Sequence, residues 1–198
     1  MRKSLYCLII AMVFMLLLLN SEVYSAENFI PVHAGQTFTF SVKDGIGNTA
    51  TELLYISGTT NIPCLTKTYF SGDVILKHQG VPLDNAEFFN FRSTLTKVFV
   101  YDGFCKEHML WQQAPVGTTW SHVESEGDEI ESKILAVENV TVPAGTFTGC
   151  LKIRHRCTNC SGSADWIEWV KPGFFMVKWV DYWDDNPPVT YRLIKWTD

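Results

Sequence analysis

Basic residues are scarce in this sequence relative to acidic ones. The 198 residues include 16 lysines and arginines against 21 aspartates and glutamates, for a formal net charge of −5. Proteins that bind nucleic acid neutralise its phosphates with clusters of Lys and Arg. Anionic membrane surfaces attract the same kind of cluster. The acidic balance therefore argues against both partners and fits plain solubility.

Recognisable catalytic motifs are also missing. The sequence has no G-x-S-x-G serine elbow, no H-E-x-x-H, no Walker phosphate loop and no Rossmann glycines. Its histidines are scattered singly, and each is expected to be a strand or surface residue: His33, His78, His108, His122 and His155. We therefore predict a non-enzymatic protein with no catalytic residue, no metal and no cofactor.

Helical periodicity is absent from the part of the chain after residue 25. Apolar residues do not recur at i, i+3, i+4 and i+7 over any long window. Short alternating runs end instead in turns of Gly, Pro, Asp or Asn, as where Phe38, Phe40 and Val42 share one face. Strands in immediate succession favour antiparallel pairing. The sequence predicts an all-β antiparallel meander that forms a curved open sheet, a half-barrel or a sandwich.

The first 25 residues have the layout of a secretory signal peptide. A basic start, Met1–Lys3, precedes an apolar run from Leu5 to Leu19. Val23 and Ser25 occupy the small-residue positions of a cleavage site. The run is short for a membrane span of about 20 residues. We expect cleavage of residues 1–25, a single exported β domain over residues 26–198 with no transmembrane anchor, and a periplasmic or extracellular location.

Cys157 and Cys160 form a C-x-x-C pair within the stretch KIRHRCTNCSG. An exported protein meets an oxidising space, so we expect a disulfide that clasps a loop between two strands. A redox pair normally needs a helix N-terminus to lower the thiol pKa, and no helix follows. A zinc site with His155 and Cys150 lacks a second C-x-x-C pair. Both readings stay open at a lower rank, whereas haem attachment is excluded because Ser161 stands where C-x-x-C-H needs His.

Three further cysteines remain in the expected mature chain. Cys64 and Cys105 can pair across neighbouring strands, although the sequence does not require it. Cys150 then stays unpaired. Regular alternation from Phe147 points Cys150 outward, but a bulge at Gly149 would reverse the phase and bury it.

Two acidic stretches have the composition of loops. Glu124–Glu131 is predicted to be a solvated hairpin tip around Gly127, because it lacks the calcium-loop pattern. Asp181–Asn186 is predicted to be a loop before Pro187, with calcium binding as a minor alternative.

Aromatic residues gather in the last third of the chain. Trp166 and Trp169 are three positions apart, so alternation places them on opposite faces of a strand. The adjacent residues Phe174 and Phe175 are likewise expected on opposite faces. Part of this aromatic surface should lie outside one simple core. The favoured interpretation is a sheet that the rest of the domain covers on both faces, and the functional alternative is an apolar groove for a lipid, a sugar or a partner. The candidate surface for an apolar ligand or a partner comprises Trp166, Trp169, Phe174, Phe175, Trp179, Tyr182 and Trp183.

Three segments resemble the TapB family of exported bacterial proteins. They are FIPVHAGQTFTF, VENVTVPAGTFTGCLKI and WVKPGFFMVKW, in that order. The family has Trp and Tyr where Phe38 and Phe40 stand, and Val-Gly in place of Phe174 and Phe175. The resemblance implies an exported β-sheet domain whose turn and core residues are structural: Val142, Pro143, Ala144, Gly145, Phe147, Pro172 and Gly173.

The sequence thus predicts an exported β-domain of unknown function that binds an apolar small molecule or a protein of the cell envelope. The alternative is a structural or assembly component of the envelope or of pili. A C-x-x-C redox or zinc-binding protein ranks below both.

Overall fold

The structure is a computed structural model that describes residues 28–78, 81–82, 87–124, 126–161, 164–183 and 186–197. The expected signal peptide, residues 1–25, lies outside these ranges. The strands are β1 (Thr37–Lys43), β2 (Thr49–Ile62), β3 (Lys67–His78), β4 (Val81–Pro82), β5 (Glu87–Ser93), β6 (Lys97–Tyr101), β7 (Glu107–Gln112), β8 (Thr119–Val123), β9 (Glu129–Val142), β10 (Gly145–Cys157), β11 (Ala164–Val170), β12 (Met176–Trp183) and β13 (Val189–Thr197). No helix occurs in the described residues, so none there could cross a membrane.

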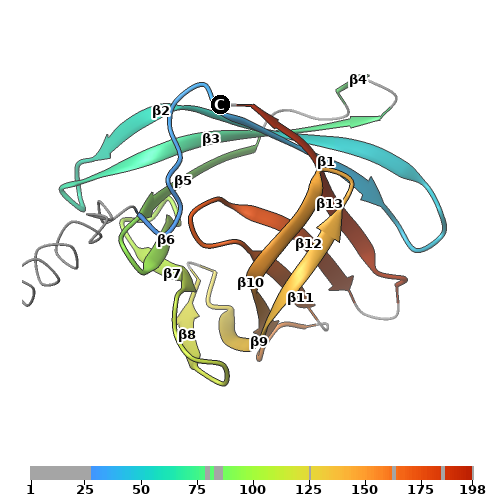
Figure 1. Cartoon of the computed structure of the whole chain (residues 1–198). Coiled ribbons are helices and arrows are strands. Elements are labelled where there is room, and N and C mark those ends of the chain that lie inside the picture. Colours follow the sequence, from blue (N-terminus) through green and yellow to red (C-terminus); the bar gives the residue numbers. More distant parts are fainter. Residues whose placement is uncertain are drawn as a thin grey trace, which may run out of the picture.

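All the strands belong to one antiparallel sheet (Figure 1). Their order is β7-β6-β5-β3-β2-β1-β13-β12-β11-β10-β9-β8, with β4 paired to β3. Most neighbours follow one another along the chain, as in a meander. One exception is β5, which pairs with β3 past the short β4, and the other is the pairing of the first strand with the last, in which Thr37 lies opposite Thr197. This pairing joins the two halves of the chain into a curved sheet. The prediction of an all-β fold is confirmed.

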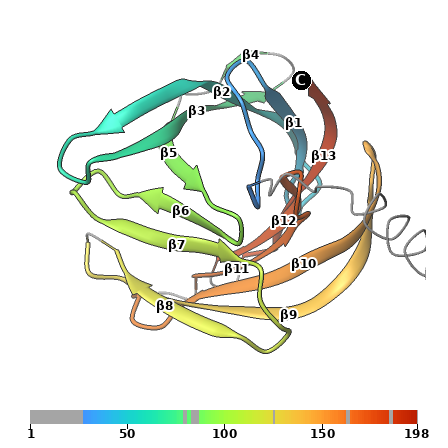
Figure 2. The same ribbon diagram turned by 60° about the vertical axis from the view of Figure 1, so that its left-hand side comes forward.

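The curved sheet comes back almost to its starting point. Its edge strands β7 and β8 lie side by side, although no ladder joins them (Figure 2). The Trp120 indole N–H donates to the carbonyl oxygen of Met109 across this gap, at 2.9 Å. The rings of His108 and His122 stack across it with centroids 4.7 Å apart. The fold is therefore a nearly closed barrel shape, closest to the half-barrel among the three expected forms.

Alternation along β1 builds part of the interior, as the sequence predicts. Phe38, Phe40 and Val42 are buried, whereas the residues between them are half-buried. Phe38 stacks on Phe175, with ring centroids 4.4 Å apart. Trp111 from β7 meets Phe175 edge to face at 5.8 Å. Aromatic rings from distant strands therefore fill the middle of the curved sheet.

The Phe174–Phe175 pair differs from its expected arrangement. The turn between β11 and β12 runs to Phe175, whose carbonyl accepts the N–H of Lys171 at 2.8 Å, and β12 begins only at Met176. Strand alternation does not apply inside a turn, and both rings contact Phe38. Phe175 is 3% exposed and belongs to the core, not to the aromatic surface on which it was expected.

The turn between β9 and β10 holds the segment that resembles the TapB turn. Pro143 and Ala144 form the turn, and Val142 pairs with Gly145. Gly145 has φ +139°, a conformation that residues with a Cβ rarely adopt. Phe147 packs on Phe174, with centroids 5.1 Å apart. On the other turn, which contains Pro172, the N–H of Gly173 donates to the carbonyl of Phe29.

A bulge at Gly149 determines whether Cys150, the cysteine outside the two disulfides, is buried. The β9–β10 register shifts between Phe147 and Cys150, and Gly149 has φ +67°. The shift reverses the phase of β10, so Cys150 is fully buried. Burial also raises the pKa of its thiol. Cys150 is therefore an inert core residue, as expected for a bulge at this position.

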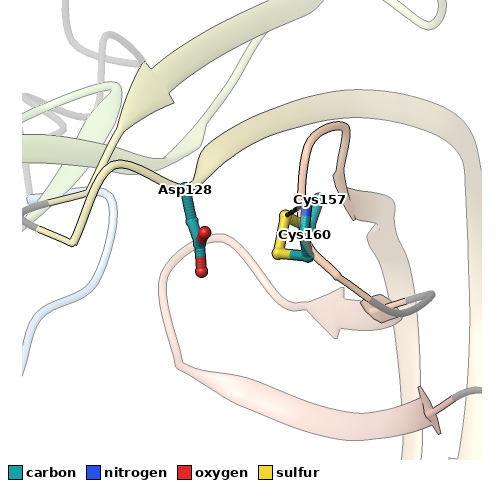
Figure 3. Close-up of side chains that lie close together, drawn as sticks. All are labelled: Asp128, Cys157 and Cys160. Carbon is teal, nitrogen blue, oxygen red and sulfur yellow. Dashed lines mark hydrogen bonds between the residues drawn. A yellow bond between two sulfur atoms is a disulfide. The ribbon is translucent and has the colours of Figure 1, made fainter.

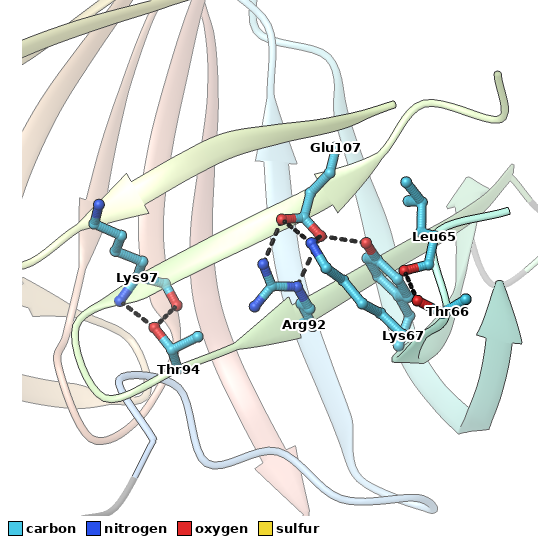
Figure 4. A network of polar contacts seen from close by, with 8 residues as sticks. Leu65, Thr66, Lys67, Arg92, Thr94, Lys97 and Glu107 are labelled. Atoms are coloured by element: carbon cyan, nitrogen blue, oxygen red, sulfur yellow. Dashed lines mark hydrogen bonds and ion pairs between the residues drawn. The ribbon is translucent and has the colours of Figure 1, made fainter. Parts of the chain in front are cut away.

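A polar network fastens β3 and β5 to the edge strand β7 (Figure 4). The Glu107 carboxylate accepts hydrogen bonds from Arg92, Tyr69 and Lys67, with Arg92 Nε at 2.7 Å. Burial alone would raise the pKa of Glu107, but these three donors lower it to about 2. Burial and the neighbouring carboxylate raise the pKa of Tyr69 to about 12.

A disulfide lies close to this network in the sequence. Cys64, from the β2–β3 turn, is bonded to Cys105, from the β6–β7 turn, with 5.7 Å between the Cα atoms. This is the second of the two pairs named from the sequence. The bond ties the far end of the β2–β3 hairpin to the β6–β7 turn.

Candidate functional site

A pocket of about 420 Å³ opens at β11 and β12, beside the β8–β9 turn and the β10–β11 connection. Its described lining combines tryptophan rings, small apolar groups and five carboxylates. The lining residues are Glu124, Asp128, Ile130, Cys157, Cys160, Ala164, Asp165, Trp166, Glu168, Trp179 and Asp181. Among the residues that the structure describes, neither lysine nor arginine lines it.

Four of these side chains form a checkerboard on β11 and β12. Trp166 lies directly opposite Asp181, and Glu168 lies directly opposite Trp179. The two members on each strand are two positions apart, so alternation places all four on one face. Each tryptophan therefore has one carboxylate across from it and the other along its own strand. We call Trp166, Glu168, Trp179 and Asp181 the Trp–carboxylate square.

Each tryptophan of the square stacks on a ring from the neighbouring strand, at the position directly opposite. Trp166 stacks on His155 from β10, with centroids 4.9 Å apart and planes at 15°. Trp179 stacks on Tyr191 from β13, with centroids 3.8 Å apart and planes at 9°. Phe40 adds an edge contact to Trp179 at 4.8 Å. The aromatic walls of the pocket are therefore set in place before any ligand arrives.

The two carboxylates of the square differ in their surroundings. Glu168 is 8% exposed, and its Oε2 accepts hydrogen bonds from Trp111 Nε1 and from His155 Nε2, the latter at 3.1 Å. Burial and the charge of Glu168 raise the pKa of Asp181 to about 6, even though the side chains of Trp179 and Tyr191 donate hydrogen bonds to it. Keeping Asp181 ionised at neutral pH in these surroundings therefore costs electrostatic free energy.

The rim of the pocket is built by two turns that fasten to each other. Asn159 accepts the N–H of Glu129 at 2.7 Å and donates to the carbonyl of Gly127 at 3.0 Å. The N–H of Thr158 donates to the carbonyl of Glu129 at 2.8 Å. The residues between the two cysteines of the C-x-x-C stretch thus dock on the β8–β9 hairpin.

The sulfur atoms of Cys157 and Cys160 are bonded to each other and line this pocket. Their Cα atoms lie 5.7 Å apart, within the ordinary range for a disulfide. Figure 3 shows the disulfide close to Asp128, which comes from the β8–β9 turn. The bond therefore closes the loop that forms one side of the rim, which is the clasp expected from the sequence.

Metal binding is not favoured by this arrangement. Asp128, Cys157 and Cys160 are the described residues whose potential ligand atoms gather within 4.8 Å of one another. Zinc takes cysteine as the thiolate, and both sulfurs here are in the disulfide. His155, the other ligand weighed from the sequence, uses Nδ1 on Ser132 at 2.8 Å and Nε2 on Glu168.

The chain Ser132–His155–Glu168 resembles a catalytic triad in composition only. Ser132 and His155 are both fully buried, so no substrate reaches the hydroxyl oxygen. A nucleophile must contact the reacting atom of its substrate. These three residues therefore form a structural hydrogen-bond relay, which orients the imidazole ring that stacks on Trp166.

The predicted aromatic surface is divided among several places. Trp166 and Trp179 line the pocket, whereas Trp169 is 6% exposed and lies under Lys178, whose Nζ is 4.1 Å from the ring centroid. Phe174 packs on Phe147 and Trp196. Tyr182 is 40% exposed beside Arg154 and Asp165. The side chain of Trp183 is outside the described residues.

The sequence analysis did not identify Glu168 and Asp181 as residues of a site. Asp181 lies where a predicted strand and the predicted loop Asp181–Asn186 overlap, and in the structure it belongs to β12 and lies opposite Trp166. Glu168 was not singled out at all. One signal was available, because Trp166 and Glu168 are two positions apart in a strand and so share a face. Strand pairing decides which face of a strand lines a pocket. The sequence of a single strand does not reveal that pairing.

Two solved structures share this fold. One, from Bacteroides fragilis, is classed as an exported protein with a YmcC-like fold; it has a TM-score of 0.60 and 13% identity, over 87% of this chain and 100% of that one. The other, from Parabacteroides distasonis, is classed as a lipoprotein; it has a TM-score of 0.57 and 15% identity, over 86% of this chain and 99% of that one. At such identities the likeness shows the fold alone.

No protein-family model and no curated protein matches the sequence. Membership of the TapB family therefore stays a prediction. What this chain shares with the two solved structures is the fold.

Proposed function

We propose that this chain is an exported, non-enzymatic β-domain that binds a small molecule in the pocket of the Trp–carboxylate square. The observation that carries the proposal is the square itself. Trp166, Glu168, Trp179 and Asp181 meet on one face of two paired strands and line a single pocket of about 420 Å³. A concave site with aromatic walls and a few convergent polar groups is the usual form of a small-molecule site.

The energetic cost of the site supports a functional role. Burial and the charge of Glu168 disfavour the ionised form of Asp181, as its raised pKa indicates. A core optimised for stability alone would carry an apolar residue at this position. Perturbed carboxylates in a pocket are typical of binding and active sites. The rings of Trp166 and Trp179 also support a functional role. Because stacking already fixes them, little side-chain entropy is lost when a ligand binds.

The ligand expected from the sequence was apolar, and the pocket modifies that expectation. A purely apolar molecule would displace water from Glu168 and Asp181 without replacing its hydrogen bonds, which is unfavourable. The proposed ligand therefore carries a polar or charged group beside its apolar part.

Export is part of the proposal. It is supported by the basic and apolar start of the sequence and by the oxidised cysteine pairs, which persist in oxidising compartments. The similar structures from Bacteroides fragilis and Parabacteroides distasonis are classed as an exported protein and as a lipoprotein.

Native mass spectrometry of the protein purified from an exporting culture tests the proposal. We expect a small-molecule mass increment that is lost on denaturation. Trp166→Leu should lose the increment, whereas Trp196→Leu, which changes an exposed tryptophan elsewhere, should keep it. A bare mass that matches the chain in both variants and in the original protein would contradict the proposal. A stable complex with another protein would favour the envelope-assembly alternative.

A further inference from the structure

The described lining of the pocket carries charge of one sign. Its five carboxylates are not matched by any lysine or arginine among the described lining residues. Three of them have cationic or potentially cationic neighbours outside the lining. Asp165 lies 3.8 Å from Arg156 Nε, and two histidine rings lie beside the others: Glu124 is 3.8 Å from His122 Nε2, and Glu168 is 3.1 Å from His155 Nε2. Among the described residues, Asp128 and Asp181 have no such neighbour, so the negative potential inside the pocket comes mainly from them, with Glu168 adding to it while His155 is neutral. A low-dielectric cleft concentrates such a field.

We propose that the pocket recognises a small organic cation, an alkylammonium ion held against Trp166 and Trp179. This inference rests on the proposed function and extends it by naming the chemical class of the ligand. An ammonium group is attracted to the face of an indole ring, and the attraction is largest where water is excluded. The checkerboard places a carboxylate opposite each of these rings, so one cation can contact a ring and a counter-ion together.

The geometry favours an organic cation over an inorganic one. Calcium takes six to eight oxygen ligands at about 2.3–2.6 Å. Within the described chain, the acids of the square do not gather with a third acidic ligand in the way that a metal requires, since Asp128 clusters only with the two bonded cysteines. Tryptophan faces contribute nothing to binding a hydrated metal ion, whereas they fit the apolar carbon groups of an alkylammonium ion.

The lining also favours a cation over a neutral sugar. Sugar hydroxyls donate and accept hydrogen bonds, so their sites mix donors with acceptors. The described lining supplies carboxylate acceptors, but its side-chain donors are limited to the two indole N–H groups. The Trp179 side chain already donates to Asp181. An ammonium ion needs acceptors and aromatic faces, and both are present.

Isothermal titration calorimetry with the exported chain tests the inference. The cationic probes are choline, tetramethylammonium and spermidine. The matched control is the neutral isostere of choline in which carbon replaces the ammonium nitrogen. We expect at least one cation to bind about tenfold more tightly than the isostere binds. Affinity should fall as salt concentration rises, because part of the attraction is electrostatic.

Variants locate the binding. Trp166→Leu and Asp181→Asn should each weaken the cation about tenfold, while Trp166→Tyr, which keeps an aromatic face, should retain most of the affinity. Glu131→Gln makes the same charge change as Asp181→Asn on the exposed face of β9 and should leave affinity within about twofold. Thermal unfolding of each variant shows that it is folded before titration.

The outcomes separate this inference from the proposed function. Equal binding of choline and its neutral isostere in the pocket, or binding of glucose there, would overturn the cationic class while the small-molecule site stands. A native mass increment together with no binding of any cationic probe would do the same. Absence of both the increment and probe binding would overturn the two proposals together.

Discussion

The indole ring of Trp166 lies parallel to the imidazole ring of His155, with 4.9 Å between the centroids and 15° between the planes. His155 is in turn fixed by Ser132 at Nδ1 and by Glu168 at Nε2. Because Glu168 also belongs to the pocket, one buried histidine sets both a wall and a carboxylate of the site. The stability of the sheet and the shape of the pocket are thus coupled at His155.

His155→Ala should lower the free energy of unfolding by about 3 kcal/mol. The change removes a fully buried ring and leaves Ser132 and Glu168 without their partner. Ser132→Ala removes a single hydrogen bond and should cost about 1 kcal/mol. Urea unfolding of the two variants measures both values. A His155→Ala variant as stable as Ser132→Ala would show that the relay does not support the fold.

Asp181→Asn should stabilise the protein at neutral pH. The folded-state pKa of Asp181 is raised to about 6 from an ordinary value of 3.8, so the folded form binds the proton more tightly. Stability therefore falls as pH rises from about 4 to about 6, and the cost is complete above that range. After allowance for solvent screening, the amide should gain about 1 to 2 kcal/mol at pH 7.5 and almost nothing at pH 4.

Chemical denaturation of the original protein and of Asp181→Asn at both pH values tests this. A variant that is less stable than the original at pH 7.5 would contradict the account of Asp181 as a carboxylate kept at a cost. The same group predicts that affinity for a cation rises between pH 5 and pH 7.5, since the cation favours the ionised carboxylate. Glu168, on the neighbouring strand, carries the charge that adds to burial in raising the pKa of Asp181.

Glu107→Gln should destabilise the protein by about 2 kcal/mol at neutral pH, because Arg92 loses a charged partner in a half-buried site. The pKa of Glu107 is lowered from 4.5 to about 2, so its contribution is full above pH 4.5 and is lost as pH falls towards 2. Glu131→Gln breaks an exposed pair with Arg154 at 4.0 Å and should cost less than about 0.5 kcal/mol. Equal effects of the two substitutions, measured by urea unfolding, would contradict this role for the network.

The two disulfides should differ in their effect on stability. Cys64 and Cys105 are 41 residues apart, whereas Cys157 and Cys160 are three apart. By loop-closure entropy, removing the first bond with paired Ser substitutions should cost about 4 kcal/mol, and removing the second about 2 kcal/mol. The second loss should also loosen the rim and weaken ligand binding. Thermal unfolding of the two double variants gives the order, and a reversed order would contradict it.

Local patterns predicted much of this fold correctly. The alternation of Phe38, Phe40 and Val42 identified the inward face of β1, because side chains in a strand alternate regardless of partner. The acidic hairpin around Gly127 was also identified, and the structure has φ +96° at that glycine. Turns and strand faces depend on a few neighbouring residues, so they can be predicted from short stretches of sequence.

Long-range pairing could not be predicted in the same way. Nothing in the sequence of β1 indicates that it pairs with β13, which begins almost 150 residues later. The break between β7 and β8 is equally invisible in a sequence of successive strands. The Trp–carboxylate square depends on the β11–β12 register, so its members became recognisable as a site only once Trp166 was seen opposite Asp181.

The most direct test of the central claim is a nuclear magnetic resonance titration of the indole N–H signals with choline, tetramethylammonium and spermidine in turn. The sequence has seven tryptophans, and single Trp→Phe variants assign their signals. We expect saturable shifts at Trp166 and Trp179 and none at Trp196, which lies against Phe147 and Phe174. Signals of Trp166 and Trp179 that stay unshifted at millimolar concentrations of all three cations, or equal shifts at Trp196, would contradict the claim that the Trp–carboxylate square is a cation site.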